Sequence, residues 1–155
     1  MKKALMMLAL ATGASVASAE SYYGLYVLGG QYTVENGDSA VRYGIGLPLG
    51  YAGGDGIALA LTGDVSYLAR GGNLSDSGRW MYGAGLGAGV AFATSGGSSA
   101  GVGFVRPFAL LNAEFNTQGS VRPFLELNGG PSVYFGAGSA VLPFTLGARL
   151  GINFH

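Results

Sequence analysis

The sequence of 155 residues contains no cysteine, only one histidine and few charged residues. Without cysteine, the chain has no disulfides, thiolate metal sites, cysteine nucleophiles or lipoprotein anchor. Charged residues make up 10% of the chain, against roughly 25% in ordinary soluble domains. A water-exposed surface is hard to build from so few charges.

The only two lysines, at positions 2 and 3, precede a short apolar stretch. That stretch is shorter than the about 20 apolar residues with which a helix spans a bilayer. It ends in Ala-Ser-Ala at 17–19, the small-x-small pattern that signal peptidase cleaves. We therefore predict a signal peptide over residues 1–19 and one β-barrel domain over residues 20–155.

Removal of both lysines leaves six basic residues (8 − 2) against eight acidic ones. The predicted mature chain therefore has a net charge of −2, which argues against a nucleic-acid partner, since such partners require clustered positive charge.

Large apolar residues alternate with small residues along four segments, 39–51, 57–68, 80–94 and 144–154. Such alternation has a period of two, which is typical of a strand and does not fit a helix. If the apolar faces formed a soluble core, water would meet mostly glycine and alanine. The opposite orientation, with apolar residues toward lipid and small ones inside a narrow lumen, agrees with the geometry of small membrane barrels. We predict an all-β fold, an antiparallel up-and-down transmembrane β-barrel.

The number of strands is less clear from the pattern. Seven segments alternate, whereas single-chain bacterial barrels have an even number of strands. An extra turn at residues 128–131 (Asn-Gly-Gly-Pro) would leave short strands on both sides, so we predict eight strands without placing the eighth. The seven segments are 21–34, 39–51, 57–69, 79–94, 101–115, 121–135 and 141–154.

The connections contain residues typical of turns. Glycine and asparagine accept positive φ easily, and they occur at 35–38 and 53–56. The longest connection runs from Arg70 to Arg79 and is mostly polar. We predict that loop 70–79 lies on the cell exterior, where it presents a surface to an envelope protein partner.

A short motif recurs along the second half of the chain. Residues 105–108 (Val-Arg-Pro-Phe) reappear at 121–124, and more loosely as Val-Leu-Pro-Phe at 141–144. These strand openings resemble those of the opacity-type, porin-like families of small bacterial outer-membrane β-barrels. The chain end, with Phe154 before His155, resembles their sorting signal, although these families usually end on the aromatic residue itself. The resemblance implies insertion by the barrel-assembly machinery and names no activity.

Residues 83–88 (Gly-Ala-Gly-Leu-Gly-Ala) match the dinucleotide-binding fingerprint by letter. That fingerprint requires a turn that opens a helix, whereas here the glycines keep a period of two. We interpret them as a smooth inner wall and predict no cofactor.

Seven charged residues fall on the predicted inward faces. Because buried charges must be paired, we predict that they form a network that fills the lumen, with Glu126 paired to Arg122; a selective pore is the alternative. The predicted lumen network comprises Arg42, Asp64, Arg106, Glu114, Arg122, Glu126 and Arg149.

Aromatic residues near strand ends predict contact with the membrane interface, where an apolar ring with a wet edge is favoured. On this basis we assign Trp80, Tyr82, Phe92 and Phe154 to the interface, and interpret eight tyrosines as part of the same belt: Tyr22, Tyr23, Tyr26, Tyr32, Tyr43, Tyr51, Tyr67 and Tyr82.

No catalytic or metal-binding residues are predicted, and we expect a protein that is not an enzyme. The one histidine, His155, is the last residue, where nothing is expected to orient it as a base. Glu114 and Glu126 are the carboxylates available for glycoside chemistry, but neighbouring arginines would keep them ionised, whereas an acid catalyst must be protonated.

These observations predict a protein of the cell outer membrane, with membrane lipids as partners and a structural role in the envelope. Two other classes of protein also fit the sequence. One is a narrow porin-like channel for small solutes, and the other is a secreted calycin-like barrel that holds an apolar ligand.

Overall fold

The computed structural model describes residues 19–47, 49–51, 57–95, 98–135 and 144–155. The predicted signal peptide lies outside this part except for Ala19, and the first strand begins at Glu20. No helix in the described part is long and apolar enough to cross a membrane.

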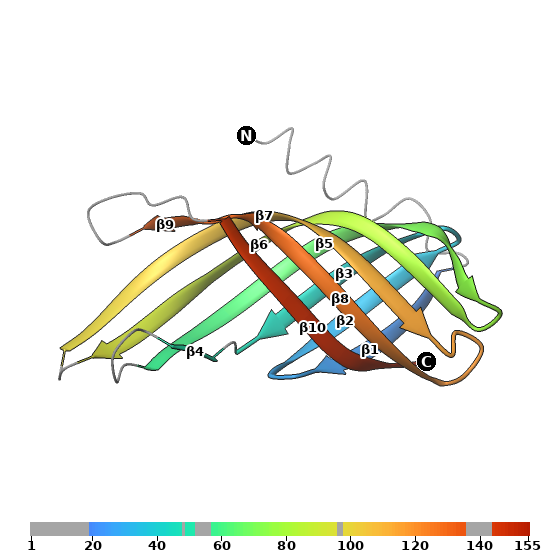
Figure 1. The fold of residues 1–155 in the computed structure, drawn as a ribbon, viewed down its shortest axis with the longest axis horizontal. Helices are drawn as coiled ribbons and strands as arrows, with labels where there is room; N and C mark the ends of the chain where they lie inside the picture. The colour runs from blue at the N-terminus through green and yellow to red at the C-terminus, as the bar shows by residue number, and fades with distance from the viewer. Residues whose placement is uncertain (1–18, 48, 52–56, 96–97, 136–143) are drawn as a thin grey trace.

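Ten strands form one antiparallel sheet (Figure 1). Their bounds are β1 Glu20–Tyr26, β2 Gly29–Asn36, β3 Ser39–Gly46, β4 Leu49–Tyr51, β5 Ile57–Ser75, β6 Gly78–Ser95, β7 Ser98–Phe115, β8 Val121–Pro131, β9 Val133–Phe135 and β10 Phe144–Phe154.

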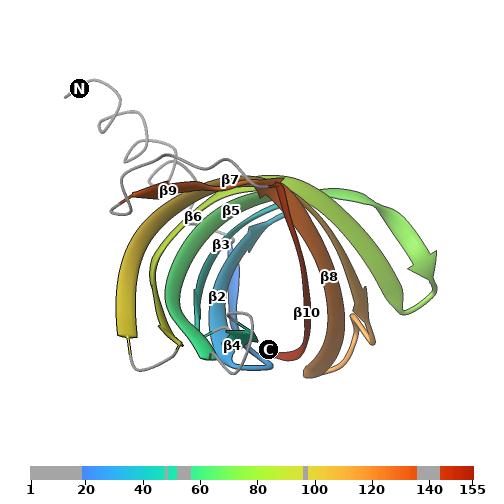
Figure 2. The ribbon, with the colours of Figure 1, turned by 60° about the vertical axis from the view of Figure 1, so that its left-hand side comes forward.

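The sheet closes on itself to form an eight-stranded barrel, as predicted (Figure 2). The long strands pair in chain order, with β3 beside β5 and β8 beside β10, and β1 pairs with β10 from Tyr23↔Phe154 onward. The short strands β4 and β9 continue the walls of β3 and β8, because they pair with β5 and β7. Closure gives each of the eight long strands a partner on both sides, as in barrels that leave no sheet edge unpaired.

The eighth strand comes from the first sequence segment. Residues 21–34, predicted as one strand, form β1 and β2 with a two-residue turn at Val27 and Leu28. Sequence analysis missed this turn because Leu28, a non-glycine residue, holds the left-handed φ of 62°. The next residue, Gly29, packs so closely on the Tyr26 ring that a Cβ there would lie 2.2 Å from it, so this position requires glycine. The alternative turn at 128–131 is wrong, since these residues lie within β8.

The prediction that residues 70–79 form a long loop is also wrong. These residues continue β5 and β6 as a hairpin whose turn is only residues 76–77. The pairing of β5 with β6 continues through this glycine-rich stretch by two register shifts, one between Arg70 and Gly72 and one between Asn73 and Ser75. The hairpin lies at the end of the barrel that holds the C-terminus (Figure 1). We call this end, with Glu20 and His155, the terminal end, and the other, with Val27 and Leu28, the distal end.

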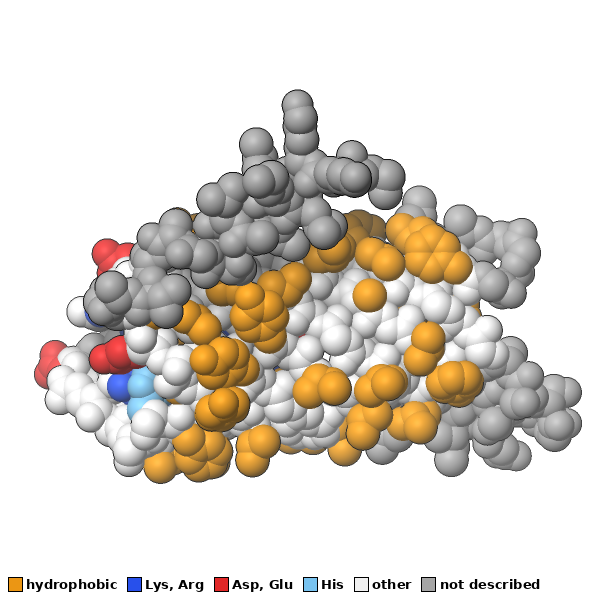
Figure 3. Space-filling view, turned by 180° about the vertical axis from the view of Figure 1, so that it is seen from behind, with side chains coloured by type: hydrophobic (Ala, Val, Ile, Leu, Met, Phe, Trp, Pro, Cys, Tyr) orange, Lys and Arg blue, Asp and Glu red, His pale blue; other side chains and the backbone are white. Residues whose placement is uncertain are grey.

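Large apolar side chains cover the outside of the barrel wall. Leu146 is 82% exposed, and Phe144, Leu150 and Leu25 are each more than 60% exposed. The space-filling view shows apolar side chains spread over the wall, whereas the visible charged groups gather at the terminal end (Figure 3). The turns at this end are short, spanning residues 37–38, 76–77 and 116–120.

The interior of the barrel is mostly polar. A small apolar cluster lines one part of the inner wall, formed by Ala40, Leu68, Met81, Phe108 and Leu110. Beside it lie charged and amide side chains with almost no solvent exposure, among them Arg42, Glu114, Glu126, Asn112 and Asn153. The distribution of polar and apolar residues is therefore the reverse of that in a soluble protein.

Candidate functional site

The lumen is the candidate site, because buried charges from strands distant in sequence meet there. Arg42 of β3 donates a hydrogen bond to Glu126 of β8, and both side chains are at most 1% exposed. Glu126 lies on the inner face because β8 places alternate residues inside, with Phe124 and Asn128 on either side of it. In a strand this alternation is enforced by the pleat.

Arg149 of β10 extends this ion pair toward the distal end. Its guanidinium donates to Asp64 of β5, with Nη2–Oδ2 at 2.5 Å and Nη1–Oδ1 at 3.3 Å, a bidentate arrangement. Arg149 Nη1 also lies 3.5 Å from Glu126 Oε1. The first network therefore links Arg42, Glu126, Arg149 and Asp64, and Asn128 donates to Glu126 at 3.2 Å.

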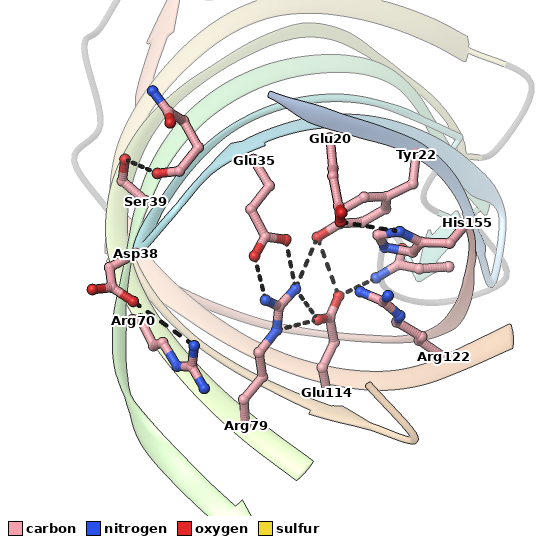
Figure 4. Close-up of polar contacts among 12 residues, drawn as sticks. Glu20, Tyr22, Glu35, Asp38, Ser39, Arg70, Arg79, Glu114, Arg122 and His155 are labelled. Atoms are coloured by element: carbon pink, nitrogen blue, oxygen red, sulfur yellow. Dashed lines mark hydrogen bonds and ion pairs between the residues drawn. The ribbon is translucent and has the colours of Figure 1, made fainter. Parts of the chain in front are cut away.

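A second network occupies the terminal end of the lumen (Figure 4). Arg79 of β6 lies at its centre and donates from Nε to Glu114 of β7 at 2.7 Å and from Nη2 to Glu35 of β2 at 2.7 Å. Tyr22 of β1 donates its hydroxyl to Glu114 at 3.3 Å. Asn153 of β10 donates to Glu114 as well and accepts a hydrogen bond from Gln31 of β2 at 2.9 Å.

The two networks connect opposite walls of the barrel. The ion pairs that cross the lumen join residues separated by 44 to 85 positions in the chain. Charges buried this completely are stable only when they are paired and hydrogen-bonded. The arrangement therefore cross-links the wall and fills the lumen with fixed side chains.

The seven charged residues predicted for the lumen lie in different surroundings. Arg42, Asp64, Glu126 and Arg149 meet in the first network, and Glu114 belongs to the second. The predicted pairing of Glu126 with Arg122 is wrong. Arg122 lies at the terminal end, where its Nε donates to the Gly119 carbonyl at 3.1 Å, and Glu126 pairs with Arg42 and Arg149 instead.

Arg106 differs from the other lumen arginines. It donates to Asn128 Oδ1 at 2.8 Å and to Thr145 Oγ1 at 3.3 Å, and its Cζ lies 5.1 Å from the centre of the Phe108 ring. No carboxylate of the described residues forms an ion pair with it.

Sequence analysis missed the centre of the second network. Arg79 was assigned to the end of a loop and Glu35 to a turn, yet both side chains are mostly buried, at 8% and 12% exposure. Arg79 could have been found by extending the inward row of Gly83, Gly85 and Gly87 backward along β6 in steps of two.

The aromatic residues assigned to the interface lie mainly on the outer wall. Tyr82, Phe92 and Phe154 are 49%, 53% and 45% exposed, and the Trp80 ring lies 5.8 Å from that of Tyr82. The tyrosine belt is wrong for Tyr22, which is 1% exposed and bonded to Glu114 inside the lumen. Tyr51 lies outside the residues whose side chains are described.

The described residues include no group of three or more histidine, cysteine or acidic side chains that could hold a metal ion. Glu114 and Glu126, the carboxylates considered for glycoside chemistry, are held by Arg79 and by Arg42 with Arg149.

Comparison with known proteins supports the class of protein that this geometry defines, the outer-membrane type of β-barrel. The chain is similar to the N-terminal β-barrel domain of Pseudomonas aeruginosa OprF, with a TM-score of 0.62 and 12% identity over 88% of this chain and 98% of that one. It is also similar to a major outer membrane protein from Thermus thermophilus, with a TM-score of 0.53 and 15% identity over 89% and 98%.

At these identities the likeness establishes the fold alone. No protein-family model matches the sequence, and no curated protein matches it closely enough to assign a relative. The predicted opacity-type family is therefore not confirmed; the chain has the fold of the outer-membrane β-barrels, and no family is assigned.

Proposed function

We propose that the chain is an integral protein of the bacterial outer membrane with a structural role in the envelope and a lumen closed by its own ion pairs. The observation that carries the proposal is the reversed distribution of side chains. Leu146 at 82% exposure faces outward, whereas Glu126 at 0% faces inward. Such a surface is stable in hydrocarbon, where apolar side chains meet lipid tails, and unfavourable in water.

Several features support this placement. The closed sheet satisfies the backbone hydrogen bonds that hydrocarbon cannot. The turns at the terminal end are short, which is typical of the periplasmic side of such barrels. Insertion by the barrel-assembly machinery and contact with outer-membrane lipids follow from the same placement, and the proposal assigns no chemical reaction.

The closed lumen favours a structural role over the alternative of a narrow channel. Ion pairs from Arg42 to Glu126 and from Arg79 to Glu35 extend across the interior at two levels. A small hydrated ion would have to displace buried, paired charges to pass. Barrels of eight strands leave little interior room beyond what side chains fill.

Two measurements test the proposal. Full-length protein expressed in a Gram-negative host should remain in the detergent-extracted envelope fraction and migrate differently on a gel before and after heating. Mature protein that is monodisperse in buffer without detergent would contradict membrane placement and favour a secreted calycin-like barrel.

The closed lumen is tested by single-channel recording in planar bilayers. The native protein should show no discrete conductance steps. A variant that removes one paired arginine from each level, Arg42→Ala with Arg79→Ala, serves as the opened control. Regular steps from the native protein would favour the porin-like channel instead.

A further inference from the structure

The lumen is hollow at the distal end, beyond the first network. A cavity of about 380 Å³ opens there between β1, β5, β6, β7, β8 and β10. The pair of Arg149 and Asp64 lies at its inner limit, and Arg106, Asn128 and Thr145 line its side. This volume falls within the range of small-molecule sites.

The charge of this cavity is unbalanced. Among the described residues, Arg106 and Arg149 line it against the single acid Asp64. Arg149 and Asp64 neutralise each other through their bidentate pair. Arg106, in contrast, forms no ion pair with a described carboxylate. Its guanidinium has five N–H donors, and among the described residues its acceptors are Asn128 and Thr145.

The walls around Arg106 are largely apolar and aromatic. The rings of Phe104 and Tyr134 lie 5.7 Å apart and both line the cavity. Phe108 also lines it and packs against the guanidinium of Arg106. A half-enclosed cation beside aromatic walls is complementary to a ligand that combines one negative group with an apolar body.

We propose that this cavity is a binding site for a small organic anion, with the carboxylate or phosphate of the ligand on Arg106 and its apolar body against Phe104 and Tyr134. The site goes beyond the structural role proposed above, and it requires only the folded barrel. It is closed toward the terminal end by the first network, so a ligand would enter and leave through the distal end.

Gly87 provides an independent way to test the site. It lines the cavity, and a Cβ built on it would meet its nearest neighbour, the Cβ of Asp64, at 3.7 Å, an ordinary contact. A larger side chain at this position would therefore extend into the cavity without displacing the backbone. The variant Gly87→Leu should block the ligand while Arg106 remains in place.

Titration calorimetry of the full chain in detergent micelles tests the proposal, with benzoate as the probe. Benzamide, which has a similar shape and no charge, should bind at least about tenfold more weakly, since it loses the charge-assisted bond. Arg106→Gln and Gly87→Leu should each weaken benzoate binding by at least about tenfold. Inorganic phosphate should bind more weakly than benzoate, because it lacks the apolar body.

The matched control is Arg122→Gln. Arg122 occupies the same place in the repeated Val-Arg-Pro-Phe motif as Arg106 but lies at the terminal end, so its removal should leave benzoate affinity unchanged. Heat-modifiable migration shows which variants are folded. If Arg106→Gln does not fold, Gly87→Leu and the comparison of benzoate with benzamide on the native chain decide the question.

Equal affinity for benzoate and benzamide, no benzoate binding at tens of millimolar, or unchanged binding in folded Arg106→Gln would each overturn the proposal. Phosphate binding as tight as benzoate would overturn the assignment of an apolar ligand body. These outcomes are independent of whether the barrel conducts ions, so failure here is distinguishable from failure of the closed-lumen proposal.

Discussion

Arg42 on β3 and Glu126 on β8 form an ion pair inside the barrel although 84 positions separate them in the chain. Both side chains are buried to at least 99%. The pair therefore depends on the closed sheet, which brings these two strands to face one another across the lumen.

We predict that removing one partner of this pair costs more than removing both. Arg42→Met leaves Glu126 buried with less compensation and should lower the free energy of unfolding by about 3–5 kcal/mol. The double variant Arg42→Met/Glu126→Leu should recover part of that loss, since Arg149 keeps its partner Asp64. Urea unfolding in detergent micelles measures the free energy of unfolding of the single and the double variant. Losses that simply add would show that the two residues are not coupled.

We predict that alanine destabilises the barrel at one glycine and is tolerated at another on the same inner face of β6. A Cβ on Gly83 would lie 2.0 Å from the backbone carbonyl oxygen of Tyr67, which cannot move without shifting β5. Gly83→Ala should therefore cost about 1–3 kcal/mol through overpacking. Gly87→Ala meets only ordinary contacts and should change stability by at most about 1 kcal/mol. Equal unfolding midpoints in urea for the two variants would contradict this difference in space.

Trp80, the only tryptophan, reports on the hairpin of β5 and β6. A Cβ on Gly71 would lie 2.4 Å from its indole ring atoms, so the ring lies directly over this glycine. We predict that Gly71→Val displaces the ring and shifts its fluorescence to longer wavelength, with little loss of stability because the ring can rotate. Gly103→Val, on β7 where an added Cβ would meet its nearest neighbour at 3.9 Å, is the control for spectral change. An unchanged spectrum in Gly71→Val would place the ring elsewhere.

His155 should titrate below its ordinary range. Partial burial lowers the pKa of His155, and the nearby charge of Arg122 lowers it further, despite Glu20 at 4.0 Å from Nδ1. Because the unfolded chain then binds the proton more readily, stability should decrease as pH falls through about 6.5. NMR titration of the His155 ring measures the midpoint in micelles and in urea. A folded midpoint above the unfolded one would reverse the sign.

The sequence pattern predicted the strands of this barrel better than its turns and its buried charges. Alternation along 39–46 and 144–154 correctly assigned the strands and their faces, because a pleat places neighbours on opposite sides whatever the rest of the chain does. The turn at Leu28 was missed because its positive φ is carried by a residue that rarely adopts it. Arg79 was missed because a glycine-rich stretch that continues a hairpin through register shifts resembles a loop.

The order of residues alone determined that this chain forms strands with one bulky apolar face and one face of small and polar residues. It also placed Arg42, Asp64, Glu126 and Arg149 on the same side of the wall. Only the tertiary structure decided that Arg42 and Arg149 share Glu126 while Arg106 has no described acid partner. The physical reason is that partners across a barrel depend on closure and on the register of every strand pair between them, which no local pattern encodes.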